Sequence, residues 1–391
     1  MTSTHRGLDV RIGINPISWS NDDLPSLGGE TSLETALAEG RAIGYAGFEL
    51  GNKFPREPKA LAAVLGKHGL ACVSGWYSGR LARDRTVAEE IEAVGPHLEL
   101  LAQNGATVMV YGEVADSIQG AAAPLYQRPR FVRDEQWREY GERLNRFGAH
   151  LAKRGLRLAY HHHMGAYVET PDDVDRLMSV TGDDVGLLFD TGHMTFAGGD
   201  AVGMLEKHVE RVCHVHCKDV RPYVIRLARN RNWSFLEAVI NGAFTVPGDG
   251  AIDFPAVLSV LHDHGYAGWL VVEAEQDPAV APSYVYAEKG YRALRGVVEH
   301  AVAIAEIVPG ATRAAHVDAA RQDDDAELAA GQRDGRALTR GQPVRAKADV
   351  TPAGRRGRHV DDGRALLRRL DEQFHHAAFR ASASTIPRSA R

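Results

Sequence analysis

The sequence is poor in cysteine, in long apolar runs and in excess positive charge, and each shortage excludes a class of protein. Its 391 residues include only three cysteines, Cys72, Cys213 and Cys217, which are too few and too unevenly spaced for a disulfide framework or a zinc ribbon. No stretch approaches the roughly 18 apolar residues of a membrane span, and the polar start lacks the apolar core of a signal peptide. A net charge of −5 gives no general footprint for nucleic acid. We therefore expect a reduced, cytoplasmic setting, with neither a membrane nor a nucleic acid as partner.

Aromatic residues are almost absent from residues 311–391, which contain no Trp or Tyr and only Phe374 and Phe379. This segment carries 16 Lys and Arg, 15 of them Arg, against 11 Asp and Glu, a net charge of +5 that leaves −10 on residues 1–310. Because it has so little apolar surface to offset its ordering entropy, we expect an Arg/Ala-rich, largely disordered tail with one short helix over 363–378. Arginine without aromatic residues is weak support for nucleic-acid binding, and we expect none.

Strand and helix patterns alternate through residues 9–310, which we expect to form one catalytic domain. The predicted strands are 10–14, 47–50, 71–76, 107–111, 156–161, 185–189, 211–216 and 269–273. The predicted main helices are 32–43, opened by a capping box from Thr31 to Glu34, then 57–68, 87–104, 134–154, 171–181, 200–208, 254–264 and 282–307, with a short extra helix at 234–240. This alternation indicates a parallel sheet, and its count matches a closed (β/α)8 TIM barrel. A doubly wound sheet is the rival, but Gly-x-Gly-x-x-Gly is absent after the first strand.

Four of the predicted strands end in side chains that bind metal ions. The run Leu187-Leu188-Phe189 leads directly into Asp190, and His216 and Glu273 likewise end apolar strands. His161 and His163 lie two residues apart and therefore share one face of their strand. Taken alone, each group could equally cap a helix or satisfy a loop. Four at corresponding positions favour a shared site, and histidines with carboxylates but no cysteine suit Mn²⁺, Co²⁺, Fe²⁺ or Mg²⁺.

Other polar and aromatic residues lie at or after strand ends, and each has a second interpretation. Glu49 could reach the same cavity, or it could form an ion pair. Lys218, two residues after His216, could be a general acid or an oxyanion partner, or it could pair with Asp219. His193 is expected to support Asp190 as a neighbour, and it is also a candidate for binding substrate. Candidates for lining a pocket are Asn15, Trp19, Trp76 and Tyr111, although aromatic residues there are often core, and Glu169 and Glu275 are alternative ligands.

Six stretches of the chain carry a resemblance to a known family. They are residues 111–113 (Tyr-Gly-Glu), 160–165 (Tyr-His-His-His-Met-Gly), 188–193 (Leu-Phe-Asp-Thr-Gly-His), 214–219 (His-Val-His-Cys-Lys-Asp), 246–254 (Val-Pro-Gly-Asp-Gly-Ala-Ile-Asp-Phe) and 272–278 (Val-Glu-Ala-Glu-Gln-Asp-Pro). Over about residues 9–307 the chain resembles the xylose-isomerase-like metal-dependent barrels and, within them, the inosose dehydratases of inositol catabolism. Two of the pieces, His-x-Lys-Asp at 216–219 and Gly-Asp-Gly-x-Ile-Asp-Phe at 248–254, are also common in sugar isomerases. The first histidine run and Glu-x-Glu-Gln-Asp-Pro are more specific.

The resemblance implies a ligand set and a reaction. Asp190, His216 and Glu273 correspond to the family's ligands for a divalent metal, with Mn or Co as the expected ion. Many relatives have a glutamate as the remaining ligand, and here His161, His163 and Glu169 are its candidates. The implied reaction is dehydration of 2-keto-myo-inositol (scyllo-inosose), a polyol ketone, to a trihydroxycyclohexane dione.

In that reaction the ion polarises the ketone, a base removes the neighbouring C–H proton, and a proton donor assists loss of the β-hydroxyl as water. Glu273, Glu49 and His163 are the candidate bases, in that order, and Lys218 or a histidine is the candidate donor. The family resemblance also admits glutathione as a cofactor and a homo-oligomer. A metal-dependent isomerase or epimerase of a ketose or inosose is the alternative, since it shares the first step and then returns the proton.

Overall fold

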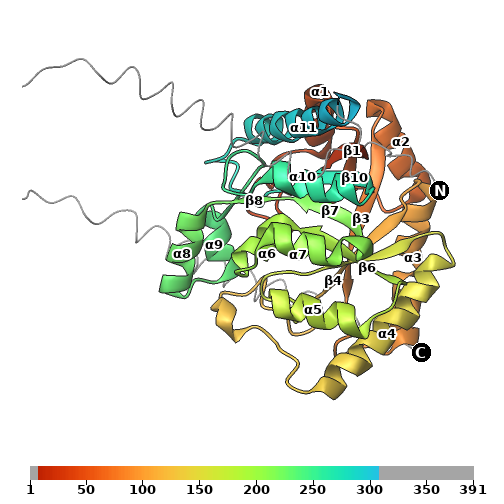
Figure 1. Ribbon diagram of the computed structural model, residues 1–391. Coiled ribbons are helices and arrows are strands. Elements are labelled where there is room, and N and C mark those ends of the chain that lie inside the picture. The colour runs from red at the N-terminus through yellow and green to blue at the C-terminus, as the bar shows by residue number, and fades with distance from the viewer. Residues whose placement is uncertain (1–7, 308–391) are drawn as a thin grey trace, which may run out of the picture. The chain divides into compact units, whose positions relative to one another are not determined.

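The structure is a computed structural model that describes residues 8–307, and these contain a closed barrel of parallel strands surrounded by helices (Figure 1). The eight barrel strands neighbour one another in the order β1-β10-β7-β6-β5-β4-β3-β2. Register pairs such as Ile14 with Val272 and Gly13 with Gly47 close the sheet through the first strand. The expected (β/α)8 fold is thus confirmed. The predicted tail of residues 311–391, and the boundary at 310, lie outside the described residues.

The elements follow one another as strand and helix. The barrel strands are β1 (Asp9–Ile14), β2 (Gly47–Leu50), β3 (Ala71–Gly79), β4 (Val108–Glu113), β5 (Arg157–His161), β6 (Val185–Asp190), β7 (Val212–Cys217) and β10 (Ala267–Val272). The helices of the outer layer are α1 (Leu33–Ile43), α2 (Pro58–His68), α3 (Val87–Gln103), α4 (Asp134–Ala152), α5 (Pro171–Val180), α7 (Ala201–His208), α10 (Phe254–Asp263) and α11 (Ser283–Ile307). Among the described residues, no helix is both long enough and apolar enough to cross a bilayer.

Local sequence explains where the helices begin. In α3 and α5 the side chains of Thr86 and Thr170 cap the first turn in full capping boxes, which satisfies backbone N–H groups that would otherwise lack partners. The capping box expected from Thr31 to Glu34 was wrong. The N-cap of α1 is Ser32, whose hydroxyl accepts the N–H of Thr35 at 3.0 Å.

Alternation along the strands separates the barrel interior from the helix layer. One buried cluster contains only strand residues, among them Val110, Ala159 and Leu188, and therefore lies inside the barrel. Leu187 and Phe189 belong instead to the large core that also contains helix residues. Since side chains alternate along a strand, Asp190 points the same way as Leu188, toward the interior. At the other strand ends, too, residues two positions apart have their side chains on the same side of the sheet.

Additional elements follow the last residues of β6 and β7. Helix α6 (Thr191–Phe196) begins directly after β6, and β8 (Asp219–Val220) pairs antiparallel with β9 (Phe244–Thr245). Between those two short strands come α8 (Pro222–Arg231) and α9 (Phe235–Ile240). The sequence predicted only α9 among these. They bring apolar side chains to the end of the barrel where the polar strand ends meet.

Candidate metal centre and active site

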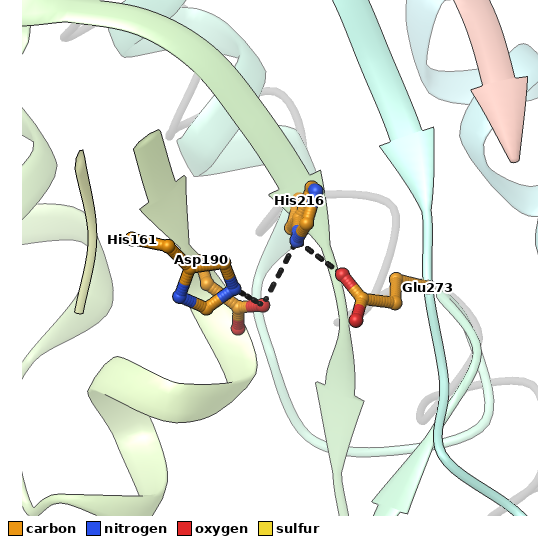
Figure 2. Close-up of side chains that lie close together, drawn as sticks. All are labelled: His161, Asp190, His216 and Glu273. Atoms are coloured by element: carbon orange, nitrogen blue, oxygen red, sulfur yellow. Dashed lines mark ion pairs between the residues drawn. The ribbon is translucent and has the colours of Figure 1, made fainter. Parts of the chain in front are cut away.

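Four predicted ligands converge at the carboxyl ends of their strands (Figure 2). His161 from β5, Asp190 from β6, His216 from β7 and Glu273 after β10 each offer one ligand atom, and these atoms all lie within 4.8 Å of one another. Asp190 Oδ2 is 3.6 Å from His161 Nε2 and 3.5 Å from His216 Nδ1. Glu273 Oε2 contacts His216 Nδ1. We call these four residues the ligand group.

The ligand group has the features of a cation site. Asp190 Oδ2, His216 Nδ1 and Glu273 Oε2 are buried and make no regular hydrogen bond, although both carboxylate oxygens lie against His216 Nδ1. His161 Nδ1 lies 2.6 Å from the carbonyl oxygen of His162, which can only accept, so the proton is on Nδ1 and Nε2 offers a bare lone pair to Asp190. Buried polar atoms of this kind are costly unless a partner satisfies them. The residues present therefore fit a divalent ion.

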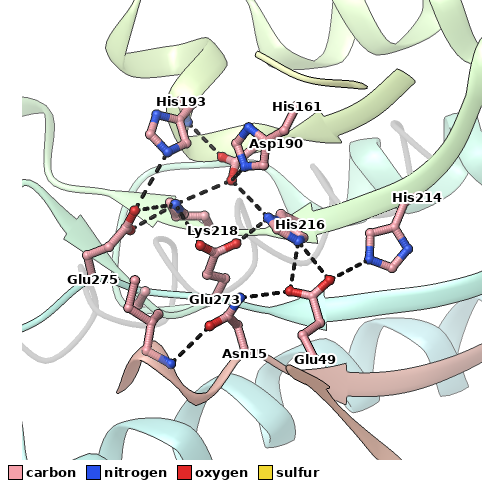
Figure 3. A network of polar contacts seen from close by, with 12 residues as sticks. Asn15, Glu49, His161, Asp190, His193, His214, His216, Lys218, Glu273 and Glu275 are labelled. Atoms are coloured by element: carbon pink, nitrogen blue, oxygen red, sulfur yellow. Dashed lines mark hydrogen bonds and ion pairs between the residues drawn. The ribbon is translucent and has the colours of Figure 1, made fainter. Parts of the chain in front are cut away.

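A single lysine ammonium balances only part of the negative charge in this region. Lys218 is fully buried, and its Nζ lies 2.8 Å from Glu275 Oε2, 3.3 Å from Glu273 Oε1 and 3.4 Å from Asp190 Oδ2 (Figure 3). Burial by itself would lower the pKa of Lys218, but the surrounding carboxylates outweigh it and raise that pKa. Glu49 adds a fourth buried carboxylate on the far side of His216. One lysine against four carboxylates leaves an excess of negative charge, which favours binding of a cation.

Two further histidines form a neutral donor and acceptor pair beside Lys218. His163 Nδ1 donates to the carbonyl of Met164 at 2.8 Å, which leaves its Nε2 as an acceptor. His193 Nδ1 accepts the N–H of Met164 at 3.2 Å, so its proton is on Nε2, which lies 3.7 Å from Glu275 Oε1. Burial lowers the pKa of His163 to about 4 and the pKa of His193 well below its usual value. The rings are 4.0 Å apart and both are uncharged.

These tautomers limit where a metal can bind. His163, His193 and Glu275 also bring one potential ligand atom each within 4.8 Å of one another. Because His193 Nε2 carries a proton and Glu275 is paired with Lys218, this second group is better suited to hydrogen bonding with a ligand than to holding a second cation.

The other predicted site residues do not all reach the ligand group. Trp76 does, with its ring 5.6 Å from that of His161 and 6.0 Å from that of His163. Asn15 and Glu49 lie behind His216 and bond to each other at 2.8 Å. Glu169 accepts the N–H of Gly165 at 2.7 Å and pairs with Arg128.

Two predicted pocket residues lie in the core instead. Tyr111 is buried in the helix layer, where its hydroxyl donates to Glu113 at 2.9 Å. The Trp19 ring is tilted against that of Phe48, with the ring centroids 5.8 Å apart, and its indole N–H donates to Glu39 at 2.6 Å. Both rings pack in the large core, and their expected role in substrate binding stays a prediction.

The sequence did not single out three residues that complete the site. His214 precedes His216 by two residues and bonds to Glu49 at 2.8 Å; the repeated His-x-His spacing was the available signal. Phe235 and Phe244 cover the histidine pair, with Phe235 stacked on His193 and Phe244 beneath the Lys218 ammonium. Nothing in the sequence marked these aromatic residues, because they belong to short elements inserted between β7 and α10.

Fold and site together define a (β/α)8 barrel enzyme with a histidine and carboxylate centre at the carboxyl ends of its strands. A family model described as "Xylose isomerase-like TIM barrel" matches residues 37–297. The inosose dehydratase of Geobacillus thermodenitrificans is 44% identical over 288 residues, which are 73% of this chain and 96% of that protein. The rhizopine catabolism protein MocC of Rhizobium meliloti is 52% identical over 288 residues, which are 73% of this chain and 88% of that protein.

A solved structure described as L-ribulose 3-epimerase shares the fold, with a TM-score of 0.55 at 18% identity over 78% of this chain and 99% of that one. The chain belongs to the xylose isomerase-like TIM barrel family, in the group that includes the relatives named inosose dehydratase, a hydro-lyase.

Proposed function

We propose that the protein is a metal-dependent hydro-lyase that dehydrates 2-keto-myo-inositol (scyllo-inosose) to a trihydroxycyclohexane dione in inositol catabolism. The observation that carries this proposal is the convergence of four buried ligand atoms at the strand ends, three of them without a regular hydrogen bond, in a chain 44% identical to an inosose dehydratase. The site also offers separate donors and acceptors for a polyhydroxy ring. A ketone with neighbouring hydroxyl groups is the kind of ligand that such a centre and such a pair of histidines can hold together.

The proposed metal ligands are His161 through Nε2, Asp190, His216 through Nδ1 and Glu273. Two histidines and two carboxylates are a mixture that suits Mn²⁺ or Co²⁺. When bound, such an ion polarises a substrate carbonyl and makes the neighbouring C–H more acidic. The chain's own residues then have to orient the ring, accept a proton and release water.

Glu273 is the base that we propose. Burial raises the pKa of its carboxyl, against the opposing effects of His216 and Lys218, and a raised pKa makes a carboxylate a better acceptor for a carbon-bound proton. Lys218 holds Glu273 and Glu275 in place and supplies fixed positive charge beside developing negative charge. Its raised pKa favours that electrostatic role over the role of proton donor.

The histidine pair is proposed to hold substrate hydroxyl groups. His193 offers Nε2–H to the departing β-hydroxyl, and His163 offers Nε2 as an acceptor for another hydroxyl. The proton that Glu273 takes from carbon is the proton that the departing hydroxyl needs, so its return as the C–O bond breaks releases water and restores the carboxylate. Trp76 lies beside both His161 and His163, where its ring can cover the apolar C–H face of the substrate.

The test is turnover of scyllo-inosose by metal-stripped protein before and after addition of Mn²⁺ or Co²⁺, followed by absorbance of the dione, with and without glutathione. We expect metal-dependent dione formation, and its loss in Asp190→Asn and Glu273→Gln while circular dichroism shows a folded barrel. Wild-type rates in either variant would overturn the proposed centre. If D₂O experiments show isotope entering the recovered sugar while no dione forms, the protein is an isomerase or epimerase instead.

A further inference from the structure

Glu49, at the end of β2, lies behind His216 and on the side away from the other ligand atoms. Its Oε2 is 3.1 Å from His216 Nε2, whereas His216 Nδ1 faces Asp190 and Glu273 (Figure 3). We infer that Glu49 is a positioning residue that keeps the proton of His216 on Nε2 and thereby presents Nδ1 as the ligand atom. This inference rests on the proposed metal centre, and it gives Glu49 a different role from that of a base.

The carboxylate of Glu49 is itself held by donors from two other strands and from the residue that follows a third. Ser74 in β3 donates to Oε1 at 2.6 Å, and His214 in β7 bonds to the same oxygen at 2.8 Å. Asn15, directly after β1, donates to Oε2 at 2.8 Å while its own Oδ1 accepts the N–H of Ile17. Glu49 is 3% exposed, so no water replaces these partners easily. Its orientation is fixed before any ligand arrives.

Because hydrogen bonds already occupy both carboxylate oxygens, Glu49 is excluded from two other roles, those of general base and of metal ligand. A general base needs a free lone pair that faces the substrate, but both oxygens of Glu49 already accept hydrogen bonds, from the buried Ser74 and His214 and from the half-buried Asn15. Glu49, His214 and His216 also bring potential ligand atoms within 4.8 Å of one another. However, His214 Nε2 is at hydrogen-bonding distance from Glu49, and the proton required for that bond occupies the lone pair that a metal would need.

The physical consequence is a carboxylate–histidine–metal arrangement. An imidazole that donates one N–H to a carboxylate is fixed in orientation and becomes a stronger ligand at its other nitrogen, and loss of such a partner typically costs about 10- to 100-fold in metal affinity. In the barrel, β2 is separated from β7 by β1 and β10, so Glu49 reaches across the interior to steady a ligand from a strand that it does not pair with.

The experiment compares Mn²⁺ and Co²⁺ affinity of the wild-type protein and Glu49→Gln by competition with a chelating indicator, without substrate. Glutamine keeps the size of the side chain but loses the charge that holds the His216 proton. We expect roughly 10- to 100-fold weaker binding and a changed visible absorption spectrum of the Co²⁺ complex. Glu113→Gln is the matched control: Glu113 is an equally buried strand-end carboxylate outside the ligand group, and its replacement should leave both readings unchanged.

Each outcome decides the inference. If Glu49→Gln binds the ions with unchanged affinity and an unchanged Co²⁺ spectrum, the inference is overturned. It is also overturned if the wild-type protein binds two ions and Glu49→Gln loses one of them, because Glu49 would then be a metal ligand. If Glu49→Gln does not fold, Ser74→Ala removes one of the bonds that orient Glu49 and should weaken binding several-fold in the same direction; unchanged affinity there would also overturn it. Failure of the wild-type protein to bind either ion would instead contradict the proposed metal centre.

Discussion

At the scale of single residues, the side of the strand decides what a buried carboxylate does. Glu49 and Glu113 both lie at strand ends and are only 3% and 2% exposed. Glu49 faces the interior and meets His216, whereas Glu113 faces the helix layer and meets Tyr111 and Tyr140. One side therefore gives a charged centre for binding a cation, and the other gives a carboxyl group surrounded by core residues. The two should respond differently to pH.

Glu113 is expected to make the stability of the barrel depend on pH. Burial raises its pKa from 4.5 to about 7, although two backbone N–H groups and two tyrosine hydroxyls favour the charged form. The folded state then holds a proton that the unfolded state has lost, so this contribution to stability is complete below about pH 4.5, falls as pH rises toward 7, and stays low above it. The full effect is on the order of 3 kcal/mol.

Urea unfolding of the wild-type protein and Glu113→Gln at pH 5 and pH 8, with a chelator present, measures this effect. Other groups titrate in both proteins, so the change in their stability difference isolates Glu113. We expect the variant to gain stability relative to the wild-type protein between the two pH values. A stability difference that does not change with pH would show that Glu113 is ionised in the folded barrel.

At the scale of elements, a loop after β9 is held by one carboxylate next to the active site. Asp219, directly after Lys218, accepts the N–H groups of Gly248 at 3.2 Å, Gly250 at 3.0 Å and Ile252 at 3.0 Å. This explains in physical terms why His-x-Lys-Asp and Gly-Asp-Gly-x-Ile occur in one chain. The loop docks on the residue that follows the site lysine, and Phe244 just before it packs against His193.

Gly250→Ala should loosen this arrangement. A Cβ at position 250 would overlap Asp219 Oδ1 and the carbonyl oxygen of Val220, so the loop must shift away from Asp219. We expect a loss of about 1–3 kcal/mol in unfolding free energy and a decrease of roughly 10- to 100-fold in kcat/KM, because Lys218 moves with its neighbour. Urea unfolding and the dione assay measure the two effects.

Gly66→Ala provides the comparison at the same scale. Gly66 lies in α2, where an added Cβ would meet nothing within 4 Å. Alanine favours the helix there, so we expect a gain of about 0.5–1 kcal/mol with no change in kcat/KM. Equal effects of the two substitutions would contradict the docking role of Gly250.

At the scale of the whole molecule, the sequence was sufficient to predict the barrel but not to predict which way every side chain points. The strands and main helices could be predicted because apolar runs and helical spacing alternate regularly, and Asp190 and Glu273 could be placed because each ends such a run. Tyr111 could not, because a strand buried on both faces shows no polar alternation from which to read its orientation. Helix α6 was missed because it begins directly after β6, with no intervening turn.

The proposed ion should stabilise the described barrel as a unit. Its ligands come from β5, β6, β7 and the end of β10, segments that lie far apart along the chain, and the unfolded chain does not bring them together. Mn²⁺ at about 100 times its dissociation constant should therefore add about 2.7 kcal/mol to the free energy of unfolding, seen as a rise of several degrees in the melting temperature. Asp190→Asn should lose this rise because it removes the atom that faces both histidines, whereas Glu113→Gln should keep it. Differential scanning calorimetry with a chelator and then with added Mn²⁺ measures the response, and an equal rise in Asp190→Asn would mean that the ion binds elsewhere.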